Sequence, residues 1–117
     1  MLDTGALLVY GSDCPVEPID PMIGIYSSVT RKKLSGAYAP DGWHPEQKLT
    51  MHETIRAFTL AAAETAGTQA TQGSISPGKL ADITVFDQDL FGVDFEMVKE
   101  TKVSATIVGG EVKFNRL

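Results

Sequence analysis

An aspartate that follows a short apolar segment near the amino terminus is the first sign of chemistry in this chain. The segment Ala6–Tyr10 is followed directly by the tripeptide Gly11–Asp13. In enzymes built on parallel strands, catalytic groups gather at the carboxyl ends of the strands, so Asp13 is our candidate catalytic residue. A carboxylate there can bind a divalent metal and carry a proton from metal-bound water to a leaving group. A polar turn or helix start has the same residue types, and the tripeptide alone leaves both interpretations open.

The two histidines, His44 and His52, are the other side chains that commonly bind metals. A catalytic zinc site normally takes three protein ligands, and a structural site takes four. We expect His44 in a proline-flanked loop and His52 on the solvent face of a helix, so the two do not form a ligand pair. His44 stands beside Trp43 and could contact a substrate, but an ordinary loop position explains it better.

Residue order argues against two further kinds of site. The segment Gly73–Lys79 has the glycine spacing of a phosphate-binding loop, but Leu80 stands where that loop needs serine or threonine. The residues that follow favour a strand, whereas a phosphate-binding loop opens a helix. No Gly-x-Ser-x-Gly sequence is present, so the nucleophile elbow of serine hydrolases is not supported.

Composition limits the partners and the cellular compartment. The 117 residues carry a formal net charge of −5 and are 43% hydrophobic, which is typical of a globular protein. A negative chain is a poor partner for nucleic acid or an anionic membrane, and we interpret the one basic cluster, Arg31–Lys33, as a solvated turn. The single cysteine, Cys14, allows no disulfide within the chain, and no signal peptide or membrane span is indicated. We therefore expect a cytoplasmic protein.

The amino-terminal elements that would position Asp13 follow from the pattern of side chains. Ala6–Tyr10 lacks polar and apolar alternation, which predicts a strand covered on both faces, as in a parallel sheet. Asp20 and Pro21 are typical of a helix N-cap and first residue, and we expect that helix to end near Thr30. A loop that contains Gly36 is expected over 33–48. The buried face of the helix is expected to carry Met22, Ile25, Tyr26 and Val29.

The second half of the chain changes from helix to strand. Thr50 and Glu53 form a capping box, which predicts a helix that ends at Gly67, with Met51, Ile55, Phe58 and Ala62 on one face. We expect a strand over 80–86 and a short helix over 95–102. A hairpin is predicted from strands at 103–108 and 111–115, joined by Gly109–Gly110.

Taken in order, these motifs resemble the carboxyl-terminal end of the metal-dependent amidohydrolase superfamily. Within it, the chain is similar to amidohydrolase family 3 and its branch of N-substituted formamide deformylase-like enzymes. The pieces that carry the resemblance are Thr4–Ala6, Gly11–Val16, Asp20–Met22, Gly24–Ile25, Arg31, Leu49–Thr50, Glu53, Thr59, Ala62–Ala63, Gly73–Ile75, Gly78–Ile83 and Val108–Gly110.

The resemblance implies an α/β fragment. Residues 1–70 would supply the last strand and helix of a (β/α)₈ TIM-like barrel, and residues 71–117 part of a small composite β-sandwich. It also implies that Asp13 matches the family's strand-eight aspartate, a metal ligand and proton shuttle. The complete enzyme would use a divalent metal, with zinc as the expected ion, and water to hydrolyse the carbon–nitrogen bond of a small non-peptide amide or cyclic amide.

The chain departs from the family pattern because the family's other metal ligands are not found in it. The other metal ligands of the family lie on earlier strands, which have no counterpart here, so the resemblance covers roughly the last fifth of such an enzyme. We expect the isolated chain to hold no metal tightly and to be inactive, because a single ligand does not retain a catalytic metal. The alternative is a non-catalytic structural or oligomerisation module. In that case the unpaired strand Ala6–Tyr10 would favour self-association.

Overall fold

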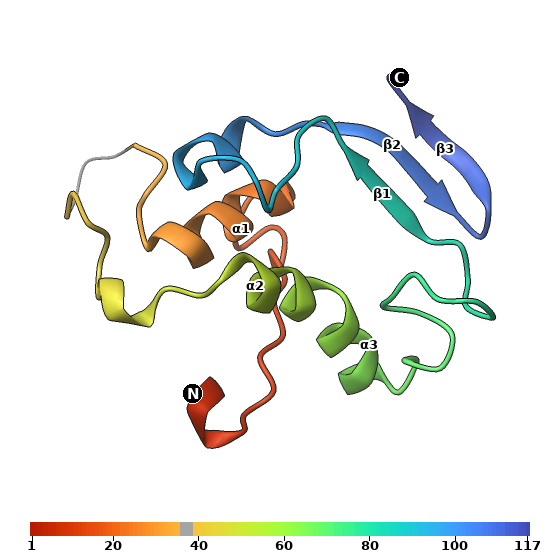
Figure 1. The fold of residues 1–117 in the computed structure, drawn as a ribbon, viewed down its shortest axis with the longest axis horizontal. Coiled ribbons are helices and arrows are strands. Elements are labelled where there is room, and N and C mark those ends of the chain that lie inside the picture. Colours follow the sequence, from red (N-terminus) through yellow and green to blue (C-terminus); the bar gives the residue numbers. More distant parts are fainter. Residues whose placement is uncertain (36–38) are drawn as a thin grey trace.

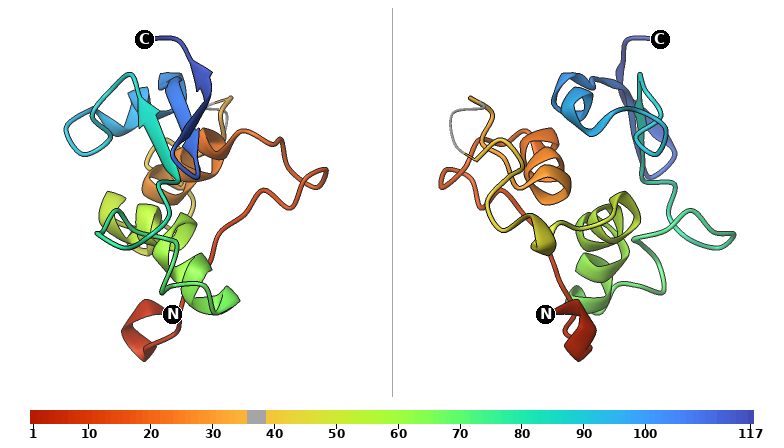
Figure 2. Two further views of the ribbon diagram at one scale, coloured as in Figure 1. Left: turned by 90° about the vertical axis from the view of Figure 1, so that its right-hand side faces the viewer. Right: turned by 60° about the vertical axis from the view of Figure 1, so that its left-hand side comes forward.

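The computed structural model describes residues 1–35 and 39–117, and the expected loop residue Gly36 lies outside them. The helices are α1 (Pro21–Thr30), α2 (Met51–Phe58) and α3 (Leu60–Ala66), and the strands are β1 (Ile83–Phe86), β2 (Val103–Val108) and β3 (Glu111–Asn115) (Figure 1). Short 3₁₀ helices lie at Leu2–Thr4, Pro45–Gln47 and Phe95–Glu100. The sheet stands to one side of the helices, and the amino-terminal segment leaves the body as an extended arm (Figures 1 and 2).

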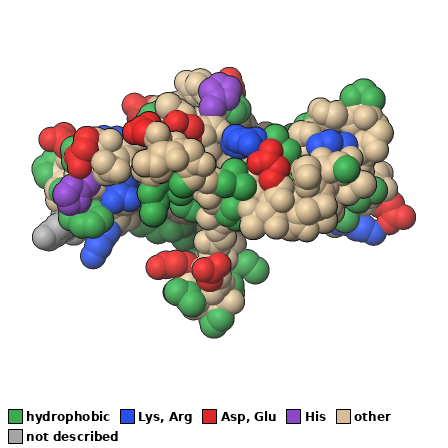
Figure 3. Space-filling view, turned by 90° about the horizontal axis from the view of Figure 1, so that it is seen from below, with side chains coloured by type: hydrophobic (Ala, Val, Ile, Leu, Met, Phe, Trp, Pro, Cys, Tyr) green, Lys and Arg blue, Asp and Glu red, His purple; other side chains and the backbone are tan. Residues whose placement is uncertain are grey.

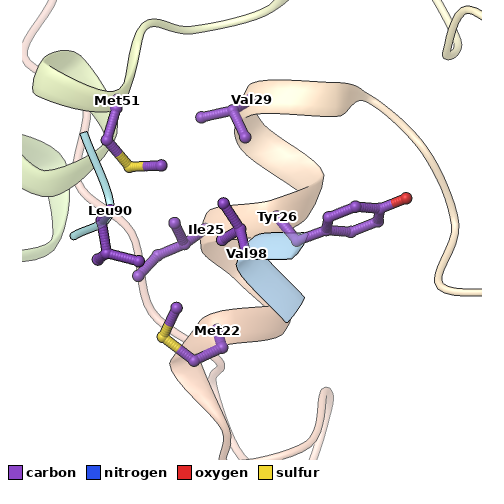
Figure 4. Close-up of a cluster of buried hydrophobic side chains, with 7 residues drawn as sticks. All are labelled: Met22, Ile25, Tyr26, Val29, Met51, Leu90 and Val98. Carbon is purple, nitrogen blue, oxygen red and sulfur yellow. The ribbon is translucent and has the colours of Figure 1, made fainter. Parts of the chain in front are cut away.

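Helix α1 begins and ends where the sequence predicts. The Asp20 carboxylate accepts a hydrogen bond from the Met22 amide at 2.9 Å, and Pro21 is the first helical residue. The predicted apolar face is buried together with Thr30. Its side chains form the core with residues from three other segments, because only a common apolar cluster removes all of these faces from water. The core consists of Met22, Ile25, Tyr26, Val29, Met51, Leu90 and Val98 (Figure 4).

The capping box at Thr50 is present, but the single helix expected up to Gly67 is wrong. Thr50 accepts from the Glu53 amide at 3.2 Å, while the Glu53 carboxylate accepts from the Thr50 amide at 2.8 Å. The helix breaks at Thr59, which has φ −126° and ψ −90°, and α3 begins at the next residue. The Thr59 hydroxyl donates to the Ile55 carbonyl at 2.7 Å, and such back-bonding bends helices. Gly67 ends α3 in the left-handed region, as predicted.

The three strands form one antiparallel sheet in the order β1-β2-β3. The predicted hairpin is confirmed, with Gly109 and Gly110 at φ 58° and 83° between β2 and β3. Strand β1 is shorter than the predicted 80–86, and the short helix predicted over 95–102 is the 3₁₀ turn Phe95–Glu100. The sheet packs on the helices through Phe86 of β1, which lies against the core.

The expected strand Ala6–Tyr10 is not formed. These residues are not part of any sheet, and Leu7 and Val9 are 49% and 42% exposed. The Tyr10 amide donates to the Ala57 carbonyl of α2 at 3.2 Å, so the segment lies against a helix. The physical reason is that a buried parallel strand needs a strand on each side, and the described strands all pair with one another in the carboxyl-terminal sheet.

Candidate functional site

Asp13 lies at the end of the extended arm in an uncommon backbone conformation. Its φ is 49°, in the left-handed region, where a side chain costs free energy that glycine avoids. The turn is closed by backbone bonds, from the Val16 amide to the Asp13 carbonyl at 2.9 Å and from the Glu17 amide to the Ser12 carbonyl at 3.2 Å. The turn that the sequence left open as an alternative is therefore present. The backbone closes it, and the carboxylate makes no hydrogen bond within the described residues.

The Asp13 carboxylate folds back over Gly11. A Cβ placed on Gly11 would lie 3.1 Å from Asp13 Oδ1, so a larger residue at position 11 would crowd the carboxylate. Asp13 itself is exposed to solvent. The carboxylate is thus held at the surface, next to a residue with no side chain, where a small molecule can reach it.

Gly11 and Ser12 line one end of a groove of about 570 Å³. The groove follows α1 past Ile23 and Ser27 and is also lined by Lys33, which comes after the last helical residue. A helix of ten residues is about 15 Å long, so the groove extends well beyond the turn that holds Asp13. A volume of this size is typical of a site for a small molecule.

The histidines do not join Asp13. His44 Nδ1 lies 2.9 Å from Glu46 Oε1, and its ring meets the Trp43 ring edge-on at 4.5 Å. His52 is exposed on α2, as expected, and its ring lies 4.6 Å from that of Phe91. Across residues 1–35 and 39–117, no cluster of three or more His, Cys, Asp or Glu side chains could hold a metal ion. The residues present do not fit a complete catalytic metal site.

The basic cluster Arg31–Lys33 is only partly the solvated turn that we expected. Arg31 Nε donates to the Trp43 carbonyl at 3.0 Å, and its guanidinium lies 5.1 Å from the centre of the indole ring. Lys32 Nζ donates to Glu96 Oε1 at 2.6 Å. Two of the three cations therefore join α1 to distant segments, a role that no local pattern in the sequence indicates.

Glu96 is the centre of a polar cluster between α1 and the Phe95–Glu100 turn. Its second oxygen, Oε2, accepts from the buried Tyr26 hydroxyl at 3.0 Å. Hydrogen bonds from Lys32 and then Tyr26 lower the Glu96 pKa, whereas burial and then the bond to Glu96 raise the Tyr26 pKa. The bond to Glu96 raises the Lys32 pKa. This cluster stabilises the docking of the turn on α1 and lies outside the groove, apart from Lys32.

A larger cavity of about 810 Å³ separates α2 and α3 from the sheet. Its walls are mainly apolar, with Ile55 and Phe58 on the helix side and Ile83 and Phe86 on the strand side. Its one carboxylate, Asp82, accepts from the Gly109 amide at 2.8 Å and from Gln72 Nε2 at 3.3 Å. That carboxylate holds the hairpin in place, so the groove beside Asp13 is the better candidate for chemistry.

The described surface mixes acidic, basic and hydrophobic side chains, with no large field of one sign on the face in Figure 3. None of the helices in the described part of the chain is long and apolar enough to cross a membrane.

Known proteins resemble this chain over nearly all of its length. A family model described as "Amidohydrolase family" matches residues 1–114. A putative amidohydrolase, YtcJ, of Bacillus subtilis is 29% identical over 99% of this chain and 22% of its own length. The N-substituted formamide deformylase of Arthrobacter pascens is 29% identical over 99% of this chain and 21% of its own length.

Two further relatives widen the comparison. The protein LONG AFTER FAR-RED 3 of Arabidopsis thaliana is 34% identical over 95% of this chain and 18% of its own length. The crystal structure of an amidohydrolase from Thermotoga maritima matches with a TM-score of 0.67 and 23% identity, over 98% of this chain and 24% of that one. The chain thus spans about a fifth of the length of the curated relatives that it matches.

Proposed function

The chain belongs to the amidohydrolase family, and we propose that it supplies Asp13 to a metal-dependent hydrolase of carbon–nitrogen bonds in small non-peptide or cyclic amides. In this proposal, residues 1–70 complete a barrel whose last strand is Leu7–Gly11, and residues 71–117 contribute to a small β-sandwich. Asp13 would be one of the residues that hold the metal, and it would carry a proton during hydrolysis. The other ligands come from segments outside this chain.

The backbone of Asp13 is the observation that carries the proposal. An aspartate at φ 49° is less stable than glycine would be at the same position, by about 1 kcal/mol. Because the turn is closed by backbone bonds, it does not require the carboxylate, which can therefore serve as a metal ligand. Asp13 does not itself line the groove, but its neighbours Gly11 and Ser12 do, and its carboxylate lies next to Gly11.

The metal in this proposal is a divalent ion, with zinc as the first candidate. Zinc binds carboxylate oxygens together with histidine nitrogens and lowers the pKa of bound water to about 7. Asp13 provides one such oxygen ligand, and the described residues do not bring the remaining ligands together. The proposal therefore requires histidines or acids from preceding barrel strands.

Two substitutions at Asp13 test the proposal in the assembled enzyme, which is this chain together with the segments that carry the other metal ligands. Asp13→Asn is expected to lower amide hydrolysis at least about 100-fold, because it removes the proton carrier. Asp13→Gly is expected to lose activity similarly while unfolding at equal or slightly higher urea concentration, because it relieves the left-handed strain. Activity comparable to wild type in either variant would rule out the assigned role.

The same proposal predicts that the 117-residue chain does not hydrolyse amides by itself. Incubation with zinc, followed by removal of free ion and metal analysis, measures whether the chain retains an ion. Stoichiometric zinc with hydrolysis of a formamide would contradict the requirement for further ligands.

The alternative, a non-catalytic module that associates with itself, rests on the exposed apolar residues Leu7 and Val9 of the arm. Sedimentation tests this alternative, because the module predicts a dimer or larger species.

A further inference from the structure

The groove beside Asp13 has opposite charges at its two ends. Glu17 and Asp20 line it before and at the start of α1, close to the Gly11–Ser12 end. Lys32 and Lys33 line it just beyond the end of α1. The helix between them measures about 15 Å, so one end of the groove is acidic and the other is basic.

Apolar side chains also line the groove. They are Ile23 of α1, Leu34 after the helix and Phe58 of α2. Leu34 is 46% exposed, so it offers apolar surface that a bound molecule can cover. An apolar segment of a ligand would gain free energy here, whereas a charged one would lose hydration.

Lys33 is the cation at the basic end of the groove with the fewest interactions with other described residues. Its neighbour Lys32 is bonded to Glu96, and Arg31 is bonded to the Trp43 carbonyl. Within residues 1–35 and 39–117, Lys33 forms no salt bridge, and it is exposed. An ammonium group in this state is able to bind an incoming carboxylate.

We propose that the groove binds amides that carry a carboxylate at the far end of an apolar chain, with the amide near Asp13 and the carboxylate on Lys33. Glu17 and Asp20 repel the carboxylate from the acidic end, so the charges set the direction in which the molecule lies. This inference rests on the proposed function for the identity of the reacting group. It adds a substrate class and a specificity-determining residue.

The test measures binding and turnover of ε-formamidocaproate and its neutral methyl ester by the assembled enzyme. Wild-type enzyme is expected to bind the acid about threefold more tightly than the ester, which is in the range of an ion pair with an exposed lysine. Lys33→Met is expected to remove this preference, while Lys33→Arg keeps it. Lys48→Met is the matched control, since Lys48 is an exposed lysine of the same region that does not line the groove.

Equal affinity for acid and ester in the wild type, no binding of either, or an unchanged preference in Lys33→Met would overturn the inference. Circular dichroism of each variant establishes that the fold is intact, and Lys33→Gln provides a second neutral variant. Turnover separates this inference from the proposed function. If the acid binds through Lys33 but is not hydrolysed, the proposed function fails and the binding assignment stands. If both compounds are hydrolysed without preference, only the binding assignment fails.

Discussion

The Tyr26–Glu96 hydrogen bond yields the sharpest prediction about stability. Tyr26 is only 1% exposed, and its hydroxyl donates to a carboxylate that is 47% exposed and also bound by Lys32. Tyr26→Phe removes the hydroxyl and keeps the ring in the core. A hydrogen bond to a charged group contributes about 1.5–3 kcal/mol, and exposure of the Glu96 carboxylate reduces this. We expect a loss of about 1 kcal/mol in the free energy of unfolding at pH 7.

The pH dependence of this loss follows from two pKa shifts. The Glu96 pKa is lowered in the folded chain, mainly by Lys32, so its contribution is present above the usual carboxyl range and is lost as the pH falls through the lowered pKa. The Tyr26 pKa is raised above 10.0, mainly by burial, so its contribution is lost as the pH rises through the raised value. Lys99 Nζ, 5.2 Å from the Tyr26 ring centre, also faces this cluster.

Urea unfolding from pH 3 to pH 8, followed by far-ultraviolet circular dichroism, measures these effects. The difference between wild type and Tyr26→Phe is expected to shrink as the pH falls below the usual carboxyl range and Glu96 becomes protonated. Tyr10→Phe is the matched control, because the Tyr10 ring packs on Phe58 and its hydroxyl makes no hydrogen bond within the described residues. The reasoning is refuted if Tyr26→Phe is as stable as wild type at pH 7, or if the difference is the same at pH 3.

Two further substitutions test the positioning of the helices. Gly42→Ala is expected to destabilise the chain by about 3 kcal/mol or more, because Gly42 has φ 91° and a Cβ there would lie 2.2 Å from the Thr30 carbonyl oxygen. Thermal unfolding measures the loss, and a melting temperature within about 2 °C of wild type would contradict the packing described at the end of α1. Thr50→Ala is expected to cost about 1 kcal/mol by removing the capping box at Glu53. A Thr50→Ser variant should retain most of that stability, and equal losses in the two variants would argue against the cap.

Local signals were sufficient wherever the determining partner lies nearby in the chain. Asp20 and Pro21 start α1, Thr50 starts α2, and Gly109–Gly110 close the hairpin, and all three were predicted from short patterns. Each of these features is set by hydrogen bonds or φ preferences within a few residues. The type and position of Asp13 also identified it from sequence as the residue most able to do chemistry, and that assignment stays a prediction.

Tertiary structure decided the features whose partners lie far away. Ala6–Tyr10 has the composition of a buried strand, yet it is an extended arm, because strand formation depends on neighbours rather than on the segment's own residues. The break at Thr59 is an exception of local origin, because the Thr59 hydroxyl bonds to the Ile55 carbonyl, and periodicity alone does not predict it. The bond of Lys32 to Glu96, 64 residues away, and the groove that links Gly11 to Lys33 follow from packing alone. Amino-acid order by itself therefore determined the helix starts, the hairpin and the candidate carboxylate. The three-dimensional arrangement decided which of the cations Arg31–Lys33 are paired with other described residues, because ion pairing depends on distance in space.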